Sequence, residues 1–170
     1  MHATKMNNPP SIPQNEAMSR RHLAHVAPTM DTPIAFITVT THERRPILNR
    51  AEVQMELEAI WKRSSELDGW FVGDFLLMPD HLHFFARPAK ESKAMAAWVQ
   101  MWKSLSARAF GKAFGAVVPV WQADYFDRYL RSGESYSEKW AYVELNPVRA
   151  GLVAKAEDWK FKGRIHELRF

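Results

Sequence analysis

The stretch that decides the fold is WFVGDFLLMPDHLHFFAR, residues 70–87. Its first half, residues 70–78, is rich in aromatic and branched apolar side chains and predicts a β-strand. Pro79 and Asp80 are typical turn residues, and residues 81–87 form a second apolar run. We therefore predict two neighbouring strands joined by a tight turn, which is a β-hairpin.

The second strand of this hairpin carries His81 and His83, two positions apart. Successive side chains of a strand point to opposite faces of the sheet, so both imidazoles would lie on one face. A strand presents two metal ligands in this way, but the pair alone is a weak motif that also occurs by chance. The chain contains no cysteine, so any metal must be held by histidine, carboxylate or amide groups.

Outward from the hairpin, apolar residues recur at helical spacing in three segments, and β-branched or aromatic residues dominate two others. In chain order we predict a strand over 34–41, a helix over 49–68, the hairpin strands over 70–78 and 81–87, a helix over 92–110, a strand over 117–126, and a helix over 134–146 that Pro147 ends.

This order of elements predicts the fold class. Strand, helix, strand, strand, helix, strand is the split βαβ arrangement of ferredoxin-like α+β domains, a sandwich of an antiparallel sheet and helices, here with an extra C-terminal helix. The first and third strands are central neighbours in that topology, so the strand with the two histidines lies in the middle of the sheet. Two crossover helices cover one face, which leaves the other available for a metal site.

Composition is that of one globular domain with extensions. The 170 residues are 46% hydrophobic and 12% aromatic, enough for one core. Residues 1–32 carry several prolines among polar residues without a period, so we predict a flexible N-terminal extension. We assign residues 33–163 to one globular domain and residues 164–170 to a C-terminal tail.

The charge and the absence of long apolar runs narrow the setting. Net charge is +4, which suits an anionic partner but does not identify one. The N-terminus lacks the apolar run of a signal peptide, and no stretch reaches the roughly 20 apolar residues of a membrane helix. We expect a cytoplasmic protein without a membrane partner.

A second chemical feature lies in the last predicted helix. Tyr142 and Asn146 stand four residues apart, so a hydroxyl and an amide would project from one helix face. Residue types alone favour another interpretation, in which Tyr142 is a half-buried core tyrosine and Asn146 the last helical residue before Pro147.

Three segments together resemble the single-tyrosine HUH transposases, with the REP-associated tyrosine transposases as the nearest branch. They are MPDHLH at 78–83, WQADYFDR at 121–128 and YVELNPVRAGLV at 142–153. The resemblance covers residues 33–163 and reverses the chance interpretation of the histidine pair and the core interpretation of Tyr142. Asp80 stands where the family more often has asparagine, a change that a turn accommodates.

The resemblance implies a ferredoxin-like domain that cuts and rejoins single-stranded or hairpin DNA through a 5′-phosphotyrosine intermediate. Tyr142 matches the nucleophile, His81 and His83 match two metal ligands, and Asn146 matches a third. A free tyrosine has a pKa of about 10, so forming its phenolate at pH 7 costs about 4 kcal/mol. A divalent cation nearby would offset that cost and polarise the phosphate. We expect Mg²⁺, with Mn²⁺ able to substitute because it accepts imidazole more readily.

Several points stay open at this stage. Tyr125, Tyr129 and Tyr136 are rival nucleophiles, and Trp98 and Trp102 have the spacing of core residues but could stack on bases. The segment 160–164 could reach DNA or be a frayed tail. For phosphate contacts we favour cations near the predicted site, each of which could also be a solvated surface charge: Arg44, Arg45, Lys103, Arg108, Arg128, Arg131 and Arg149.

Two other functions remain possible beside a transposase that is a monomer or a homodimer. One is a domesticated DNA-binding regulator that has lost turnover, and the other is a metal-dependent phosphodiesterase that uses water. Retention of Tyr142 beside both histidines argues against the regulator. A covalent protein–DNA adduct would separate the transposase from both alternatives.

Overall fold

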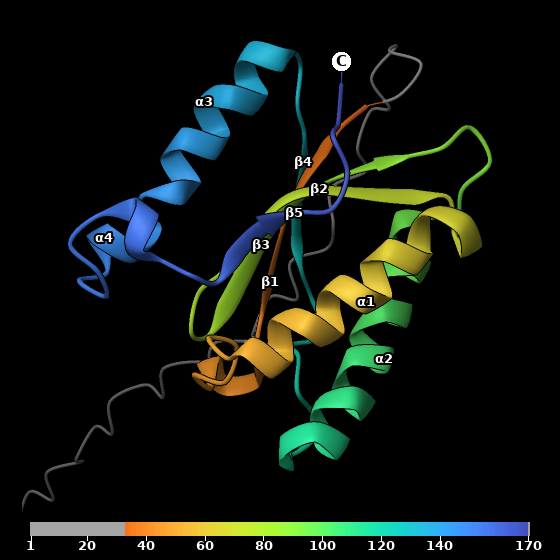
Figure 1. Ribbon diagram of the computed structural model, residues 1–170. Helices are drawn as coiled ribbons and strands as arrows, with labels where there is room; N and C mark the ends of the chain where they lie inside the picture. The colour runs from red at the N-terminus through yellow and green to blue at the C-terminus, as the bar shows by residue number, and fades with distance from the viewer. Residues whose placement is uncertain (1–32, 170) are drawn as a thin grey trace, which may run out of the picture.

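The computed structural model describes residues 33–169, so the predicted N-terminal extension lies outside the described residues. Five strands form one antiparallel sheet in the order β4-β1-β3-β2-β5 (Figure 1). The elements are β1 (Ala35–Thr40), η1 (His42–Arg44), α1 (Ala51–Leu67), β2 (Trp70–Leu77), β3 (His81–Pro88), α2 (Met95–Phe114), β4 (Phe126–Tyr129), α3 (Gly133–Glu144), α4 (Asn146–Arg149), η2 (Ala156–Asp158) and β5 (Lys162–Arg164).

The predicted fold class is confirmed. The hairpin of β2 and β3 forms as expected, and β3 lies between β1 and β2 in the middle of the sheet. In the antiparallel register His83 pairs with Thr38 and His81 with Thr40. The four strands that precede α3 have the ferredoxin-like order, and β5 is added at the edge of β2.

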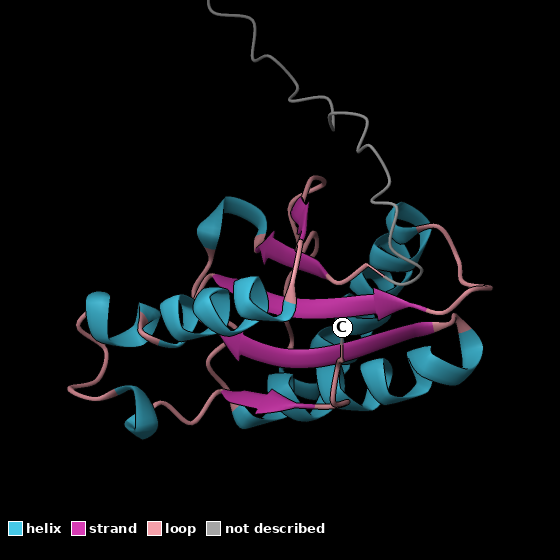
Figure 2. Cartoon of the chain, turned by 90° about the horizontal axis from the view of Figure 1, so that it is seen from above, coloured by secondary structure: helices cyan, strands magenta, loops and turns pink. Residues whose placement is uncertain are grey.

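Helices cover both faces of the sheet. The crossover helices α1 and α2 pack on one face, and α3 lies on the other (Figure 1). Figure 2, seen from the α3 side, shows helices in front of the strands and behind them. Trp98 and Trp102 of α2 are fully buried, and the Trp98 ring stacks on Trp70 at 4.5 Å between centroids. The core interpretation of these two tryptophans is therefore confirmed.

The strand predicted over 117–126 is wrong for most of its length. Residues 118–125 run as an extended segment that touches the sheet through one bridge, between Thr41 and Trp121. Pro119 has no N–H to donate to a neighbouring strand. The Trp121 side chain turns into the α2 core, where its indole N–H donates to Ser106 Oγ at 2.9 Å. Regular pairing therefore begins only at Phe126.

The last predicted helix is divided in two. Helix α3 ends at Glu144, Leu145 donates its N–H to the Val143 carbonyl oxygen, and α4 starts at Asn146. Pro147 causes the break, because it has no N–H for Val143 and its ring would clash with that carbonyl. Proline fits the first turn of a new helix, where the N–H groups have no helical partner.

The segment predicted as a tail belongs to the sheet. Strand β5 pairs with β2, and the N–H groups of Ile165 and His166 donate to the carbonyls of Gly73 and Val72. The interpretation of residues 160–164 as a frayed end is therefore wrong. Apart from the undescribed first 32 residues and Phe170, the chain contains no helix long and apolar enough to cross a membrane.

A buried carboxylate joins the two late elements to the sheet. The register of β2 shifts between Val72 and Phe75, and Asp74 within this bulge is only 4% exposed. Arg164 of β5 donates to both Asp74 oxygens at 2.8 and 3.0 Å, and the Tyr136 hydroxyl of α3 donates at 2.5 Å. One side chain of β2 thus holds both β5 and α3.

We predict that Asp74→Ala lowers the free energy of unfolding by about 2 to 3 kcal/mol, because Tyr136 and Arg164 lose their shared acceptor. Chemical denaturation followed by circular dichroism measures the change. Glu167→Ala, which removes an exposed pair with Arg169, should cost under about 0.5 kcal/mol. Equal effects of the two substitutions would contradict this account.

Candidate active site

His83 lies half-buried on the sheet face that α3 covers. Its Nδ1 is 2.8 Å from the Thr38 hydroxyl oxygen, and its ring stacks on Phe36 at 5.5 Å. Burial, and after it the positive charges of His81 and Lys139, lower the pKa of His83 to about 3. The imidazole is therefore neutral at pH 7, which is the form that binds a metal.

His81 is held from behind by a carboxylate. Its Nδ1 is 2.6 Å from Asp80 Oδ1, and Arg44 donates to the other Asp80 oxygen at 2.8 Å. Burial opposes ionisation of Asp80, but the hydrogen bonds from His81 and Arg44 outweigh it and lower the Asp80 pKa. An ionised carboxylate that accepts from Nδ1–H leaves the Nε2 lone pair of a neutral ring free.

The two imidazoles fit the donor set of a metal site. Their ring centroids are 4.9 Å apart, and within residues 33–169 neither Nε2 atom takes part in a hydrogen bond. A carboxylate on the second ring nitrogen, as Asp80 provides for His81, is a usual outer partner of a metal-binding histidine. The described residues contain no cluster of three or more His, Cys, Asp or Glu side chains, so further ligands would have to be amide, water or substrate oxygens.

Tyr142 stands over the same face of the sheet. Its side chain is 59% exposed on α3, and Arg149 Cζ lies 4.0 Å from its ring centroid. Lys139 Nζ lies 5.4 Å from the same ring and 4.5 Å from the ring of Phe36, on which His83 stacks. The phenol is therefore open to a substrate and is linked to the histidine face through Lys139 and Phe36.

The other three tyrosines are poorer nucleophile candidates. The Tyr136 hydroxyl is bonded to Asp74, and burial together with that bond raises the Tyr136 pKa well above its ordinary value. Burial raises the pKa of Tyr125 to about 12, and burial with the charge of Asp127 raises that of Tyr129. All four tyrosines of the chain are described, and only Tyr142 is exposed.

Asn146 lies at the start of α4, beyond the helix break. The prediction that one uninterrupted helix carries Tyr142 and Asn146 is therefore wrong. Tyr142 lies near the end of α3, and Asn146 is the first residue of α4. The Tyr142 carbonyl oxygen accepts a hydrogen bond from the Arg149 side chain. The Asn146 side chain makes no hydrogen bond within the described part of the chain, so its amide is uncommitted.

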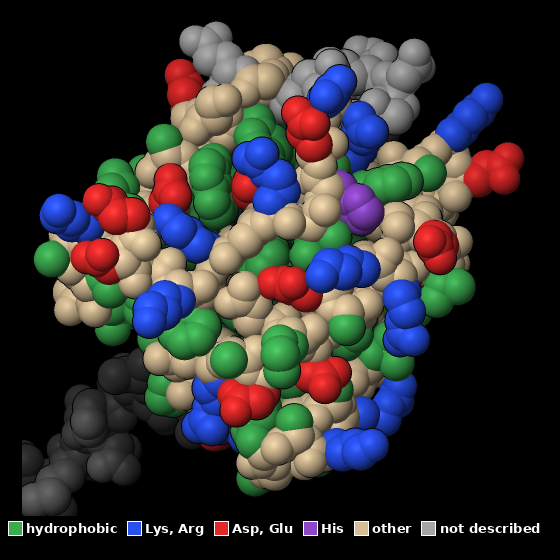
Figure 3. Space-filling view, viewed as in Figure 1, with side chains coloured by type: hydrophobic (Ala, Val, Ile, Leu, Met, Phe, Trp, Pro, Cys, Tyr) green, Lys and Arg blue, Asp and Glu red, His purple; other side chains and the backbone are tan. Residues whose placement is uncertain are grey.

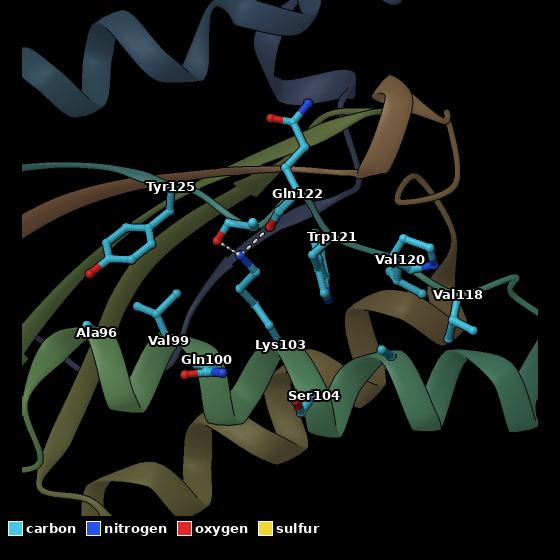
Figure 4. Close-up of a pocket in the computed structure, with 13 residues that line it drawn as sticks. Ala96, Val99, Gln100, Lys103, Ser104, Val118, Val120, Trp121, Gln122 and Tyr125 are labelled. Atoms are coloured by element: carbon cyan, nitrogen blue, oxygen red, sulfur yellow. Dashed lines mark hydrogen bonds between the residues drawn. The ribbon is translucent and has the colours of Figure 1, made fainter. Parts of the chain in front are cut away.

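Two predicted DNA contacts are engaged in the protein itself. Lys103 is 9% exposed, and its ammonium group donates to the carbonyls of Gln122 and Ala123 (Figure 4). Burial lowers the Lys103 pKa to about 8. Arg45 donates to the carbonyls of Val117 and Pro119. Both cations hold the irregular segment before β4 in place, which a search for basic residues in the sequence does not reveal.

The remaining cations differ in position. Arg44 is exposed and reaches Asp80, Arg149 lies on the Tyr142 ring, and Arg128 and Arg131 are exposed beside α3. Arg108 is exposed on α2, which covers the opposite face of the sheet. On the face seen in Figure 3, Lys and Arg side chains are interspersed with Asp and Glu side chains.

The domain thus combines a ferredoxin-like antiparallel sheet, two histidines on its central strand and an exposed tyrosine on a helix over the same face. This chain belongs to the IS200-like transposase family, whose characteristic sequence it matches over residues 33–144. The matched range includes His81, His83 and Tyr142 and ends before Asn146.

Two relatives describe the similarity further. The chain is 28% identical over 131 residues to the REP-associated tyrosine transposase of Escherichia coli K12, covering 74% of this chain and 73% of the relative. Its fold also matches a solved structure of a REP-associated tyrosine transposase bound to a REP hairpin. That match has a TM-score of 0.65 and 19% identity, and it covers 80% of this chain and 88% of the other.

We predict that Lys103→Met lowers the free energy of unfolding by about 2 kcal/mol, because the carbonyls of Gln122 and Ala123 lose a donor that is itself buried. Thermal and chemical denaturation measure the loss. Lys112→Met, at an exposed position of the same helix, is the matched control and should stay within about 0.5 kcal/mol of the wild type. A stable Lys103→Met protein with weakened DNA binding would instead restore Lys103 as a phosphate contact.

Proposed function

We propose that this protein cuts and rejoins single-stranded or hairpin DNA through a 5′-phosphotyrosine intermediate on Tyr142. The observation that carries the proposal is the position of this exposed phenol on α3, above the sheet face that holds His81 and His83. Membership of the IS200-like transposase family supports it. The hairpin bound by the structural relative favours hairpin DNA as a substrate.

The cleavage step exchanges one phosphate ester for another. The Tyr142 oxygen attacks the phosphorus and gives up its proton to solvent, the new bond joins tyrosine to phosphorus, and the bond from phosphorus to the 3′-oxygen breaks. The departing 3′-oxygen takes a proton and becomes a hydroxyl. Because the phosphotyrosine keeps the ester's free energy, attack by a 3′-hydroxyl reverses the step and joins strands without ATP.

The histidine face is the proposed site of Mg²⁺, for which Mn²⁺ would substitute. His81 and His83 would hold the ion through their Nε2 atoms, and Asn146 would add an amide oxygen. A bound divalent cation would polarise the scissile phosphate and favour an anionic attacking oxygen. Asp80 and Thr38 orient the two rings from behind. The ligands are two neutral imidazoles and an amide, so we expect weak metal binding until DNA phosphate adds negative charge.

The positively charged side chains near the tyrosine have separate tasks. We propose that the exposed side chains of Arg44, Arg128 and Arg131 contact phosphate groups of the DNA backbone. Arg149 holds the Tyr142 ring and carbonyl, so it positions the nucleophile rather than the DNA. Whether the acting species is a monomer or a homodimer does not alter these assignments, since all of these groups come from one chain.

We predict that Tyr142→Phe abolishes the covalent adduct with DNA and leaves DNA affinity within about twofold, because only the attacking oxygen is lost. Denaturing gel electrophoresis after incubation with labelled hairpin oligonucleotides from DNA flanking the gene measures the adduct. Tyr125→Phe is the control and should retain adduct formation. An adduct in Tyr142→Phe would show that another tyrosine reacts, and cleavage without any adduct in the wild type would favour the phosphodiesterase that uses water.

We also predict that His81→Ala and His83→Ala each weaken Mn²⁺ binding at least tenfold, since each substitution removes one nitrogen ligand. Electron paramagnetic resonance of free Mn²⁺, in the presence of the unreactive Tyr142→Phe chain and DNA, measures the affinity. His42→Ala removes an exposed histidine outside this face and should leave the affinity unchanged. Unaltered Mn²⁺ binding in both variants, with a large loss of stability, would make the pair core histidines.

A further inference from the structure

A pocket opens beside Tyr142, between the β4 edge of the sheet and helix α3. Its volume is about 410 Å³, which lies in the range of small-molecule sites. Phe36 and Leu130 form its apolar part, and Tyr142 lies at its border. The histidine face is close by, because Phe36 also stacks on His83.

Positive charge converges on this pocket from two elements. Arg128 of β4 and Arg131 just after it contribute guanidinium groups, and Lys139 of α3 contributes an ammonium group. Among the side chains that the structure describes, none of the three forms an ion pair with a carboxylate. Glu138 is the one acidic side chain among the described lining residues, so these residues carry a net positive charge.

The aromatic rings narrow the class of ligand. Lys139 Nζ lies 4.5 Å from the Phe36 ring and 5.4 Å from the Tyr142 ring, so cation and rings face the same space. An inorganic anion would use the cations but not the rings, and an apolar ligand would leave three cations without counter-charge. A nucleotide of single-stranded DNA uses both, through its phosphate and its flat base.

We propose that this pocket holds the nucleotide next to the scissile phosphate, with its own phosphate on Arg128, Arg131 and Lys139 and its base against the aromatic lining. The proposal rests on the proposed function, because it takes the phosphate facing Tyr142 as the one that is cut. Occupation of the pocket fixes which phosphodiester of a flexible strand meets the phenol. The pocket therefore selects the cleavage position, while a hairpin contact elsewhere would select the DNA molecule.

Fluorescence anisotropy of labelled octathymidylate tests the pocket without metal and without cleavage, in the Tyr142→Phe chain. The double variant Arg128→Ala/Arg131→Ala should weaken binding at least tenfold and flatten the log–log salt slope by about 1.4, at about 0.7 per phosphate contact. The double variant Arg63→Ala/Lys112→Ala removes the same charge from exposed positions on α1 and α2. It should change affinity less than twofold, and equal losses in the two double variants would overturn the proposal.

Nuclear magnetic resonance separates a nucleotide site from a phosphate site. Thymidine 5′-phosphate should shift the amide signals of β4 and α3, whereas inorganic phosphate and thymidine at the same concentration should shift them far less. Equal shifts with inorganic phosphate would overturn the nucleotide assignment. If wild-type protein forms the tyrosine adduct but the Arg128/Arg131 pair proves irrelevant, the pocket fails and the proposed function stands. If the Arg128/Arg131 variant loses octathymidylate binding but the wild type forms no adduct, the pocket would still bind a nucleotide, and both the proposed cleavage and the pocket's role in it would fail.

Discussion

The alternation of side chains along β3 is the constraint on which the rest of the molecule depends. Leu82, Phe84 and Ala86 are fully buried against the core of α1 and α2. Because the period of a strand is two, His81 and His83 must then face the opposite side. A slip of one residue would turn both imidazoles toward α1 and α2 and would remove three apolar side chains from that core. Pairing of β3 with a strand on each side keeps that register.

Helix α3 places Tyr142 over the sheet face that holds His81 and His83. Val143 packs on the sheet, and Tyr136 is bonded to the buried Asp74, so the helix is fixed at two levels while Tyr142 stays exposed. Beyond the helix break at Leu145, the Arg149 side chain donates a hydrogen bond to the Tyr142 carbonyl oxygen. The guanidinium group of Arg149 also lies over the phenol ring of Tyr142. Pro147 therefore affects the surroundings of Tyr142, because it ends α3 just beyond that residue.

The sequence was sufficient for the features with a strong local period. The hairpin, the shared face of His81 and His83 and the order of the first four strands all follow from alternation and turn residues. Strand β5 was missed because Lys162, Gly163 and Arg164 have no apolar alternation, and it is held instead by Asp74 at a distance of 90 residues in the chain. A partner that far away leaves no local signal.

Other differences have the same origin. Residues 117–126 contain valines and aromatics typical of a strand. Trp121 instead packs in the core against α2, and Lys103 donates to the carbonyl of Gln122. The charge of Lys103 suggested DNA, and only its burial shows that it binds the chain. For Tyr142 the sequence alone favoured a core role, whereas its exposure and the cations on its ring support a reactive one.

The most direct test of the central claim is peptide mapping of the trapped protein–DNA adduct by mass spectrometry. Trypsin cuts after Lys139 and Arg149, so Tyr142 lies in the peptide WAYVELNPVR, which contains no other tyrosine. With DNA labelled at its 3′ end, the account predicts that the labelled fragment stays on this peptide through a 5′-phosphate and that the upstream fragment leaves with a free 3′-hydroxyl. Nucleotide mass on any other peptide, or a fragment held through its 3′ end, would contradict it.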